Sequence, residues 1–89
     1  MRYEWDDEKR QQNLIKHKVD FCIAETIDWD VAAITQDKRR EYGEFRFRAL
    51  VPIVDRLYVM VFTLRSDVVR IISLRKANLR EWRKYNEKA

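Results

Sequence analysis

The chain has 89 residues, 46% of them hydrophobic and 12% aromatic, which is typical of one globular domain spanning residues 1–89. Its single cysteine, Cys22, excludes an internal disulfide framework and a zinc site built on cysteine pairs. The charged N-terminus has no apolar signal core, and no apolar run approaches the roughly 20 residues that span a bilayer. We therefore expect a cytoplasmic protein without a membrane partner, metal or cofactor.

The formal net charge of +4 is distributed unevenly along the chain. Residues 1–44 hold 8 Lys/Arg and 11 Asp/Glu, whereas residues 45–89 hold 11 Lys/Arg and 4 Asp/Glu. Eight of those eleven basic residues are arginine, whose planar guanidinium suits phosphate. The pattern indicates either a nucleic-acid partner, or a basic surface that is solvated or neutralises an acidic protein.

The N-terminal half predicts a short strand and two helices. Residues 2–5 are β-prone and can form an edge strand. Asp6 is a helix N-cap before two acidic residues, and it predicts a surface helix that ends near His17. Asp20 is a second N-cap, for a short helix whose apolar stripe is Phe21, Ala24 and Ile27. Residues 29–37 show no pattern that assigns them to a helix or a strand.

The C-terminal half predicts three strands after a charged connection at residues 38–44, which turns at Gly43. The strands are expected at residues 45–51, 57–65 and 68–75. In the first of them Phe45, Phe47 and Ala49 alternate with Arg46 and Arg48. The dipeptide Ser66-Asp67 is a tight turn, so the last two strands should form an antiparallel hairpin.

A final helix is expected to begin near Asn78, because Asn78 and Glu81 resemble a capping box. Its apolar stripe consists of Leu79, Trp82 and Tyr85. The predicted order is β-α-α-β-β-β-α, an α+β fold with an antiparallel sheet.

Arginine is the most distinctive feature of the predicted sheet. Five arginines lie in or at the ends of the strands: Arg46, Arg48, Arg65, Arg70 and Arg75. Arginine on an apolar sheet is costly unless one face is open to solvent or to a ligand. Each arginine alone is explained as an exposed residue, but together they predict a phosphate-binding face.

The register of the hairpin decides whether Arg65 and Arg75 share that face. A strict two-residue turn places them on opposite faces, whereas a three-residue turn or a bulge brings them to the same one. The residues leave both registers open.

Metal-independent RNA cleavage needs a base, an acid and cations that stabilise the phosphorane. His17 is the sole histidine of the chain and has a suitable ordinary pKa, but it can equally be a packing residue on the apolar side of its helix. Glu44 is the other candidate base, and it can equally be an ion-pair partner of a neighbouring arginine.

Three blocks of the sequence resemble the BrnT family, in order and at the right spacing. They are EWDDEKRQQNLIKHKVDF, YGEFR and VFTLRSDVVRIISLRKA, of which the third is the most specific. A charged helix with Tyr85 closes the pattern. The chain departs from it at Lys18, where the family usually has Gly, and at Leu74, where it often has a small residue.

The resemblance implies a RelE-like fold, in which helices on one face of an antiparallel sheet leave an open face for RNA. It also implies a growth-arresting, metal-independent endoribonuclease toxin. Its partner would be a cognate BrnA-type antitoxin, a ribbon-helix-helix protein through whose complex alone operator DNA is bound. The competing interpretation is a non-catalytic module that binds RNA or protein.

The resemblance also implies site residues by position. We assign Arg65 and Arg75 to the phosphate and the transition-state charge, and Glu44 or His17 to proton transfer. Ser73 joins the catalytic group without an assigned role. The residues expected to position RNA are Arg46, Arg48 and Arg70.

Overall fold

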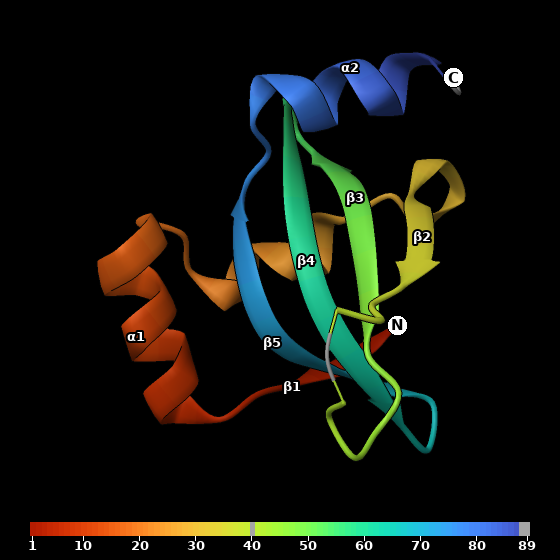
Figure 1. The fold of residues 1–89 in the computed structure, drawn as a ribbon. Helices are drawn as coiled ribbons and strands as arrows, with labels where there is room; N and C mark the ends of the chain where they lie inside the picture. The colour runs from red at the N-terminus through yellow and green to blue at the C-terminus, as the bar shows by residue number, and fades with distance from the viewer. Residues whose placement is uncertain (40, 88–89) are drawn as a thin grey trace.

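The computed structural model describes residues 1–39 and 41–87, which form an α+β fold around one sheet (Figure 1). The strands of this part of the chain are β1 (Arg2–Glu4), β2 (Ala33–Gln36), β3 (Phe47–Ile53), β4 (Arg56–Arg65) and β5 (Val68–Lys76). They lie in the order β1-β5-β4-β3-β2. The helices are α1 (Asp7–His17) and α2 (Leu79–Glu87), with the short 3₁₀ helices η1 (Phe21–Thr26) and η2 (Trp29–Val31).

The element order differs from the predicted one in two places. Residues 29–37, which showed no pattern, contain η2 and the strand β2. This strand is four residues long and depends on its pairing with β3, where Ala33 lies opposite Leu50. The second predicted helix is the 3₁₀ helix η1, whose Phe21 and Ala24 are fully buried. The sheet is also not wholly antiparallel, because β1 pairs with β5 in parallel.

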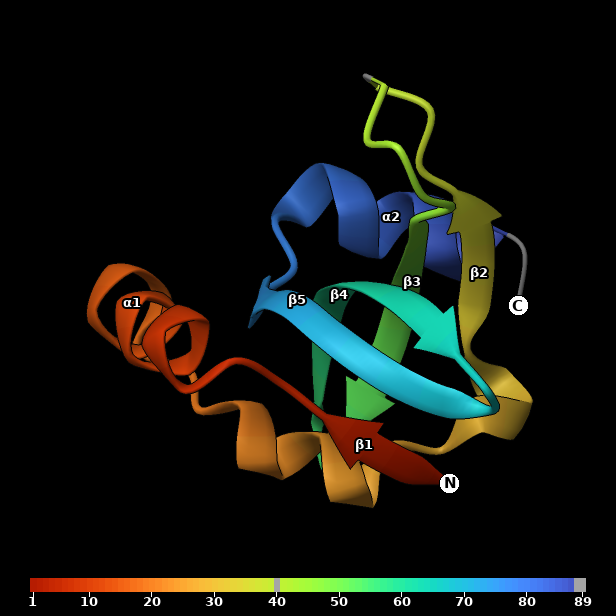
Figure 2. The same ribbon diagram turned by 90° about the horizontal axis from the view of Figure 1, so that it is seen from below.

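The resemblance implied that the helices lie on one face of the sheet, but the structure places them on both faces and at one edge. Figure 2 shows α2 and residues 37–39 and 41–46 on one side of the sheet and η1 on the other, while α1 lies beside the β5 edge. The face toward η1 carries the main hydrophobic core, and we call it the core face. Its buried strand residues are Ala49, Val51, Ile53, Met60, Phe62, Val69, Ile71 and Leu74.

Local signals at the start of the chain are confirmed. Asp6 caps α1 by accepting hydrogen bonds from the backbone N–H groups of Glu8 and Lys9, at 2.8 and 3.3 Å. Asp20 caps η1 through the N–H of Cys22 at 3.1 Å. Lys18 ends α1 with φ of 60°, in the left-handed region where glycine carries no Cβ penalty. Lys18 thus stands at a position whose backbone conformation favours glycine.

The apolar stripe predicted for α2 is wrong. Leu79 is 61% exposed and Trp82 51% exposed, so neither packs in the core. The buried residue of this helix is Glu81. The capping box is confirmed, because Asn78 and Glu81 each accept a bond from the other's backbone N–H, at 2.8 and 2.9 Å. The helix is thus oriented by a buried carboxylate rather than by hydrophobic packing of that stripe.

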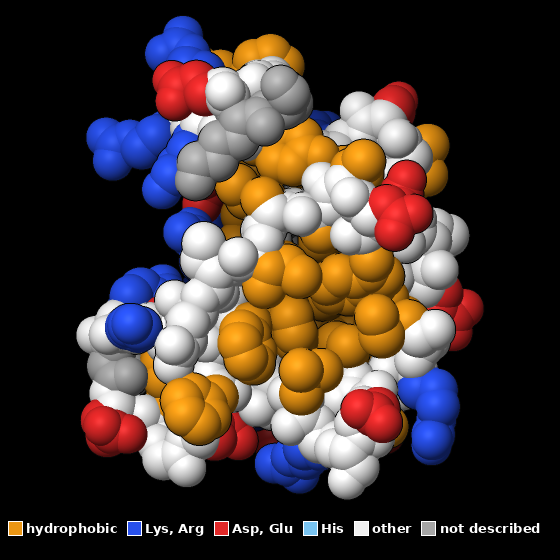
Figure 3. All heavy atoms as spheres, turned by 90° about the vertical axis from the view of Figure 1, so that its right-hand side faces the viewer, with side chains coloured by type: hydrophobic (Ala, Val, Ile, Leu, Met, Phe, Trp, Pro, Cys, Tyr) orange, Lys and Arg blue, Asp and Glu red, His pale blue; other side chains and the backbone are white. Residues whose placement is uncertain are grey.

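The chain also exposes hydrophobic side chains at the β2 edge (Figure 3). Ile34 of β2 and Val31, two residues before this strand, are each about half exposed.

Across residues 1–39 and 41–87, no helix is long and apolar enough to cross a membrane.

Asn13 joins α1 to the sheet. Its side-chain amide is buried and donates to the carbonyl oxygens of Val19 and Leu74, at 3.0 and 2.7 Å. Its Oδ1 accepts from the N–H of Leu74 at 3.1 Å. Since β1 pairs only with the first residues of β5, Asn13 takes the place of a neighbouring strand beside Leu74.

We expect Asn13→Ala to lower the free energy of unfolding by about 2–3 kcal/mol, because it leaves buried backbone groups without partners. Urea unfolding followed by circular dichroism measures this loss. Gln11→Ala, a change at an exposed position of the same helix, is the control. A loss below about 0.5 kcal/mol, the usual effect of a surface change, would contradict this role.

Candidate functional site

The hairpin register brings the strand arginines to one face of the sheet. Ser66 and Asp67 have φ of 49° and 69°, as a two-residue type I′ turn requires, and Arg65 lies opposite Val68. Farther along, Phe62 pairs with Ile71 but Val61 pairs with Ser73, so that Ile72 is an extra residue in β5. This bulge reverses the alternation of β5 and places Arg75 on the same face as Arg65.

We call this surface the arginine face. Along β4 the alternate residues Val59, Val61, Thr63 and Arg65 point to it. Their partners in neighbouring strands therefore share it: Arg75 is opposite Val59, Arg70 opposite Thr63 and Arg48 opposite Val61. The sequence left two registers open, and the structure has the two-residue turn together with the bulge.

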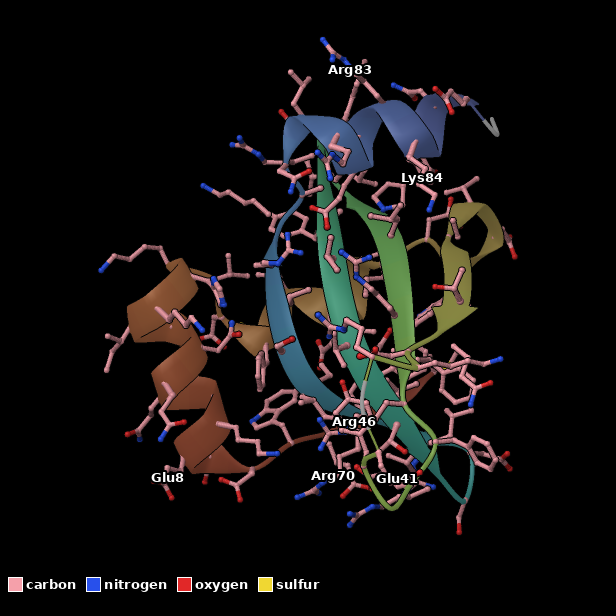
Figure 4. All side chains as sticks on the ribbon, in the orientation of Figure 1. Glu8, Glu41, Arg46, Arg70, Arg83 and Lys84 are labelled. Carbon is pink, nitrogen blue, oxygen red and sulfur yellow. The ribbon has the colours of Figure 1, made fainter. Side chains whose placement is uncertain are left out.

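Arg65 and Arg75 share the face but not one pocket. Arg65 lies six positions along β4 from Val59, the partner of Arg75, which corresponds to roughly 20 Å of strand. The arginines accordingly form two clusters, one against α2 and one against the loop before β3. Figure 4 shows Arg46 and Arg70 near the second cluster, with Arg83 and Lys84 on α2 at the other end of the sheet.

The first cluster is centred on Glu81 of α2. Its carboxylate accepts two hydrogen bonds from Arg75, both of 2.8 Å, and another from Arg48. These cations, Arg75 first, lower the pKa of Glu81 from 4.5 to about 2 despite its burial. Glu81 in turn raises the pKa of Arg75. Glu81 and Arg75 therefore both stay charged at neutral pH.

The second cluster is centred on Glu44, which precedes β3. Its carboxylate contacts Nε of Arg46 at 3.2 Å and a terminal nitrogen of Arg65 at 4.0 Å. The guanidinium of Arg46 also stacks on the ring of Tyr42, 4.1 Å from its centre. Beside this cluster, Arg70 donates to Glu4 of β1 at 2.7 Å.

His17 and Ser73 line a pocket of about 230 Å³ between α1 and β5, with Lys16 among its other lining residues. Burial, Lys16 and Arg75 all lower the pKa of His17 below 6.5. Its imidazole is therefore neutral at pH 7 and can accept a proton. Glu44 belongs to the other cluster, so the two candidate bases lie in different parts of the molecule.

Sequence reasoning missed two carboxylates that hold arginine side chains in place, those of Glu81 and Asp37. Glu81 was identified only as a helix cap, although an acidic residue just after basic strands was a signal for an ion pair. Asp37 is buried and accepts from the Arg39 guanidinium at 2.9 and 2.8 Å and from the Tyr42 hydroxyl at 3.1 Å. These bonds shape the loop before β3; Arg40 in this loop lies outside the described residues.

Within the described ranges, no three His, Cys, Asp or Glu side chains gather in a way that could hold a metal ion.

A comparison with models of known families gave a match for this chain. The matching model is described as the ribonuclease toxin, BrnT, of type II toxin-antitoxin systems, and it covers residues 5–81. The class is thus that of ribonuclease toxins, whose type II systems imply an antitoxin partner. The chain belongs to the BrnT toxin family. A search of curated proteins gave no match.

Glu81 should make stability depend on acid pH. Because its pKa in the folded state lies below 4.5, its ion pairs stabilise the fold above pH 4.5, and this stabilisation is lost as the pH falls through about 2. We expect Glu81→Gln to cost about 2–3 kcal/mol at pH 7 and almost nothing near pH 2. Unfolding measured across this range checks it, with Glu87→Gln as control. A deficit that is equal at both pH values would contradict the prediction.

Proposed function

We propose that this chain is a metal-independent endoribonuclease with a RelE-like fold, which cleaves RNA in the cytoplasm and arrests growth. The observation that carries the proposal is the bulge at Ile72, because it aligns Arg75 with the other strand arginines on one face. The family match supports the ribonuclease part of the proposal.

The arginine face suits a single strand of RNA. Its cations come from three strands and extend along the sheet, so successive phosphates can each meet a guanidinium. Arg65 is the most open of them, with 57% of its side chain exposed. Arg46, Arg48 and Arg70 would position the strand. Their carboxylate partners hold the guanidinium groups in place before RNA arrives, which lowers the cost of ordering them.

Cleavage would begin when a base removes the proton of the 2′-hydroxyl, whose oxygen then attacks the adjacent phosphorus. The P–O5′ bond breaks, which leaves a 2′,3′-cyclic phosphate, and the 5′-oxygen takes a proton from the protonated base or from water. His17 is the base that the geometry favours, since it is neutral, borders a pocket and lies near Arg75. Arg75 would stabilise the charge of the phosphorane, and the Ser73 hydroxyl can donate to a phosphate oxygen. Glu44, with Arg46 and Arg65, is the alternative centre for the same chemistry.

The antitoxin in this proposal is a BrnA-type protein with a ribbon-helix-helix DNA-binding part. A face rich in arginine attracts an acidic segment, so the antitoxin can block RNA by covering that face. Operator DNA would be bound through the complex of the two proteins.

Arg65→Ala should reduce cleavage by about tenfold or more, because a phosphate contact of the open cluster is lost. Purified protein is incubated with mixed cellular RNA and EDTA, and the products are separated on a gel. Arg83→Ala removes the same charge from the outer side of α2 and should cleave normally (Figure 4). Cleavage that EDTA abolishes would refute metal independence. RNA that is bound but left intact by the wild-type protein would favour a non-catalytic binding module.

His17 predicts a defined pH profile. The rate should fall in acid as the imidazole is protonated, with an apparent pKa below 6.5. His17→Gln should lower the rate about 100-fold or more and remove this acidic limb. The measurement is the initial cleavage rate between pH 4.5 and 8. If the variant keeps both the rate and the limb, Glu44→Gln becomes the next variant to test as the base.

A further inference from the structure

Phe45 is an exposed aromatic residue whose ring does not pack in the hydrophobic core. The sequence predicted it as part of a strand, in line with Phe47, but β3 begins only at Phe47. Phe47 stacks on Phe62 in the core, at 5.5 Å between ring centres. Phe45 is instead 72% exposed, and its backbone carbonyl is held by the Thr63 hydroxyl at 2.7 Å. Its ring is thus presented to solvent from a fixed backbone position.

A pocket of about 640 Å³ lies beside this ring. Its described lining residues are Gln36, Asp37, Lys38, Glu41, Tyr42, Gly43, Glu44 and Phe45. Two of them are aromatic, and Tyr42 carries the Arg46 guanidinium on its ring. Asp37 holds Tyr42 through its hydroxyl, and the N–H of Asp37 donates to the carbonyl of Arg46 at 2.8 Å. These hydrogen bonds and the stacking contact therefore hold one wall of the pocket in a defined conformation.

We propose that this pocket binds an unpaired nucleobase of the RNA, stacked on Phe45, and so sets the base preference of the enzyme. The inference rests on the proposed function, because the base must belong to a strand held on the arginine face. Glu44 connects the two regions, since it lines the pocket and also contacts Arg46 and Arg65. A phosphate bound by these arginines would leave its base within reach of Phe45.

The lining of the pocket offers an acceptor for a base edge. Of its three carboxylates, Asp37 is paired with Arg39 and Glu44 with Arg46, and Glu41 is the third. A base edge can donate its N–H groups to such an acceptor, whereas a phosphate cannot. Guanine fits best because its adjacent N1–H and N2–H groups can donate together to one carboxylate. The exposed Glu41 at the loop offers such a carboxylate (Figure 4).

The test uses fluorescein-labelled 2′-O-methyl hexanucleotides, which lack the attacking hydroxyl and stay intact. One contains a single guanine among uracils, a second has uracil in its place, and a third has an abasic residue there. Wild-type protein should bind the guanine probe about tenfold more tightly than the abasic one, as expected for stacking. Phe45→Ala should lose about the same factor on the guanine probe and nothing further on the abasic probe.

Two variants serve as controls for this measurement. Phe45→Trp keeps a stacking surface and should retain guanine binding, while Leu79→Ala removes an exposed apolar side chain from α2 and should bind as wild type. Glu41→Gln should reduce the preference for guanine over uracil without changing binding to the abasic probe.

Equal binding of the guanine probe by the wild type and Phe45→Ala would overturn the inference. If the wild type still cleaves cellular RNA in EDTA, the proposed ribonuclease function survives that result. Unchanged RNA binding together with weaker antitoxin binding by Phe45→Ala would also overturn it, since Phe45 would then be a protein contact.

Discussion

The extra residue Ile72 in β5 determines which side chains reach each face of the sheet. Ile71 and Leu74 both enter the core face, although a regular strand would send them to opposite faces. Ser73 and Arg75 consequently join the arginine face. Asn13 binds the backbone of Leu74 directly after the bulge, which holds the strand in this register. Packing of the core and placement of the cations therefore depend on the same irregularity.

Carboxylates make this concentration of positive charge compatible with a folded domain. Glu81, Glu44 and Glu4 each contact arginines of the face, so that like charges are separated by an opposite one. Glu81 connects the largest number of elements, because its carboxylate pairs with Arg48 of β3 and Arg75 of β5 and so joins both strands to α2. A ligand phosphate would meet cations that already have a partner, and it would compete for them or use their remaining N–H groups.

Local signals allowed much of the fold to be predicted. The caps at Asp6 and Asp20, the hairpin at Ser66-Asp67 and the capping box at Asn78 each depend on residues close in sequence. Other features depend on pairing between segments that are distant in sequence, and a short window of sequence does not encode such pairing. These features are β2, the bulge and the contacts of Asn13. The same distinction applies to the candidate site. The arginines were identified from their strands, whereas their separation into two clusters follows from the tertiary register.

The family resemblance indicated a ribonuclease toxin, which the periodicity of the sequence did not. The match over residues 5–81 confirms the resemblance. It implied helices on one face of the sheet, whereas in the structure the ion pairs of Glu81 hold α2 against the arginine face, opposite η1. The resemblance did not reveal Asp37, whose buried ion pair with Arg39 gives the loop before β3 its shape.

The two edges of the sheet differ in how they can meet another chain. On one side β1 is three residues long and carries Arg2 and Glu4, and farther along Asn13 occupies the edge of β5. On the other side β2 presents an uncharged, exposed edge. Edge-to-edge growth is therefore available in one direction only. Two copies joined along β2 would complete each other's sheets and leave no open edge of this kind, so such an association would stop at a closed pair instead of extending into a fibre.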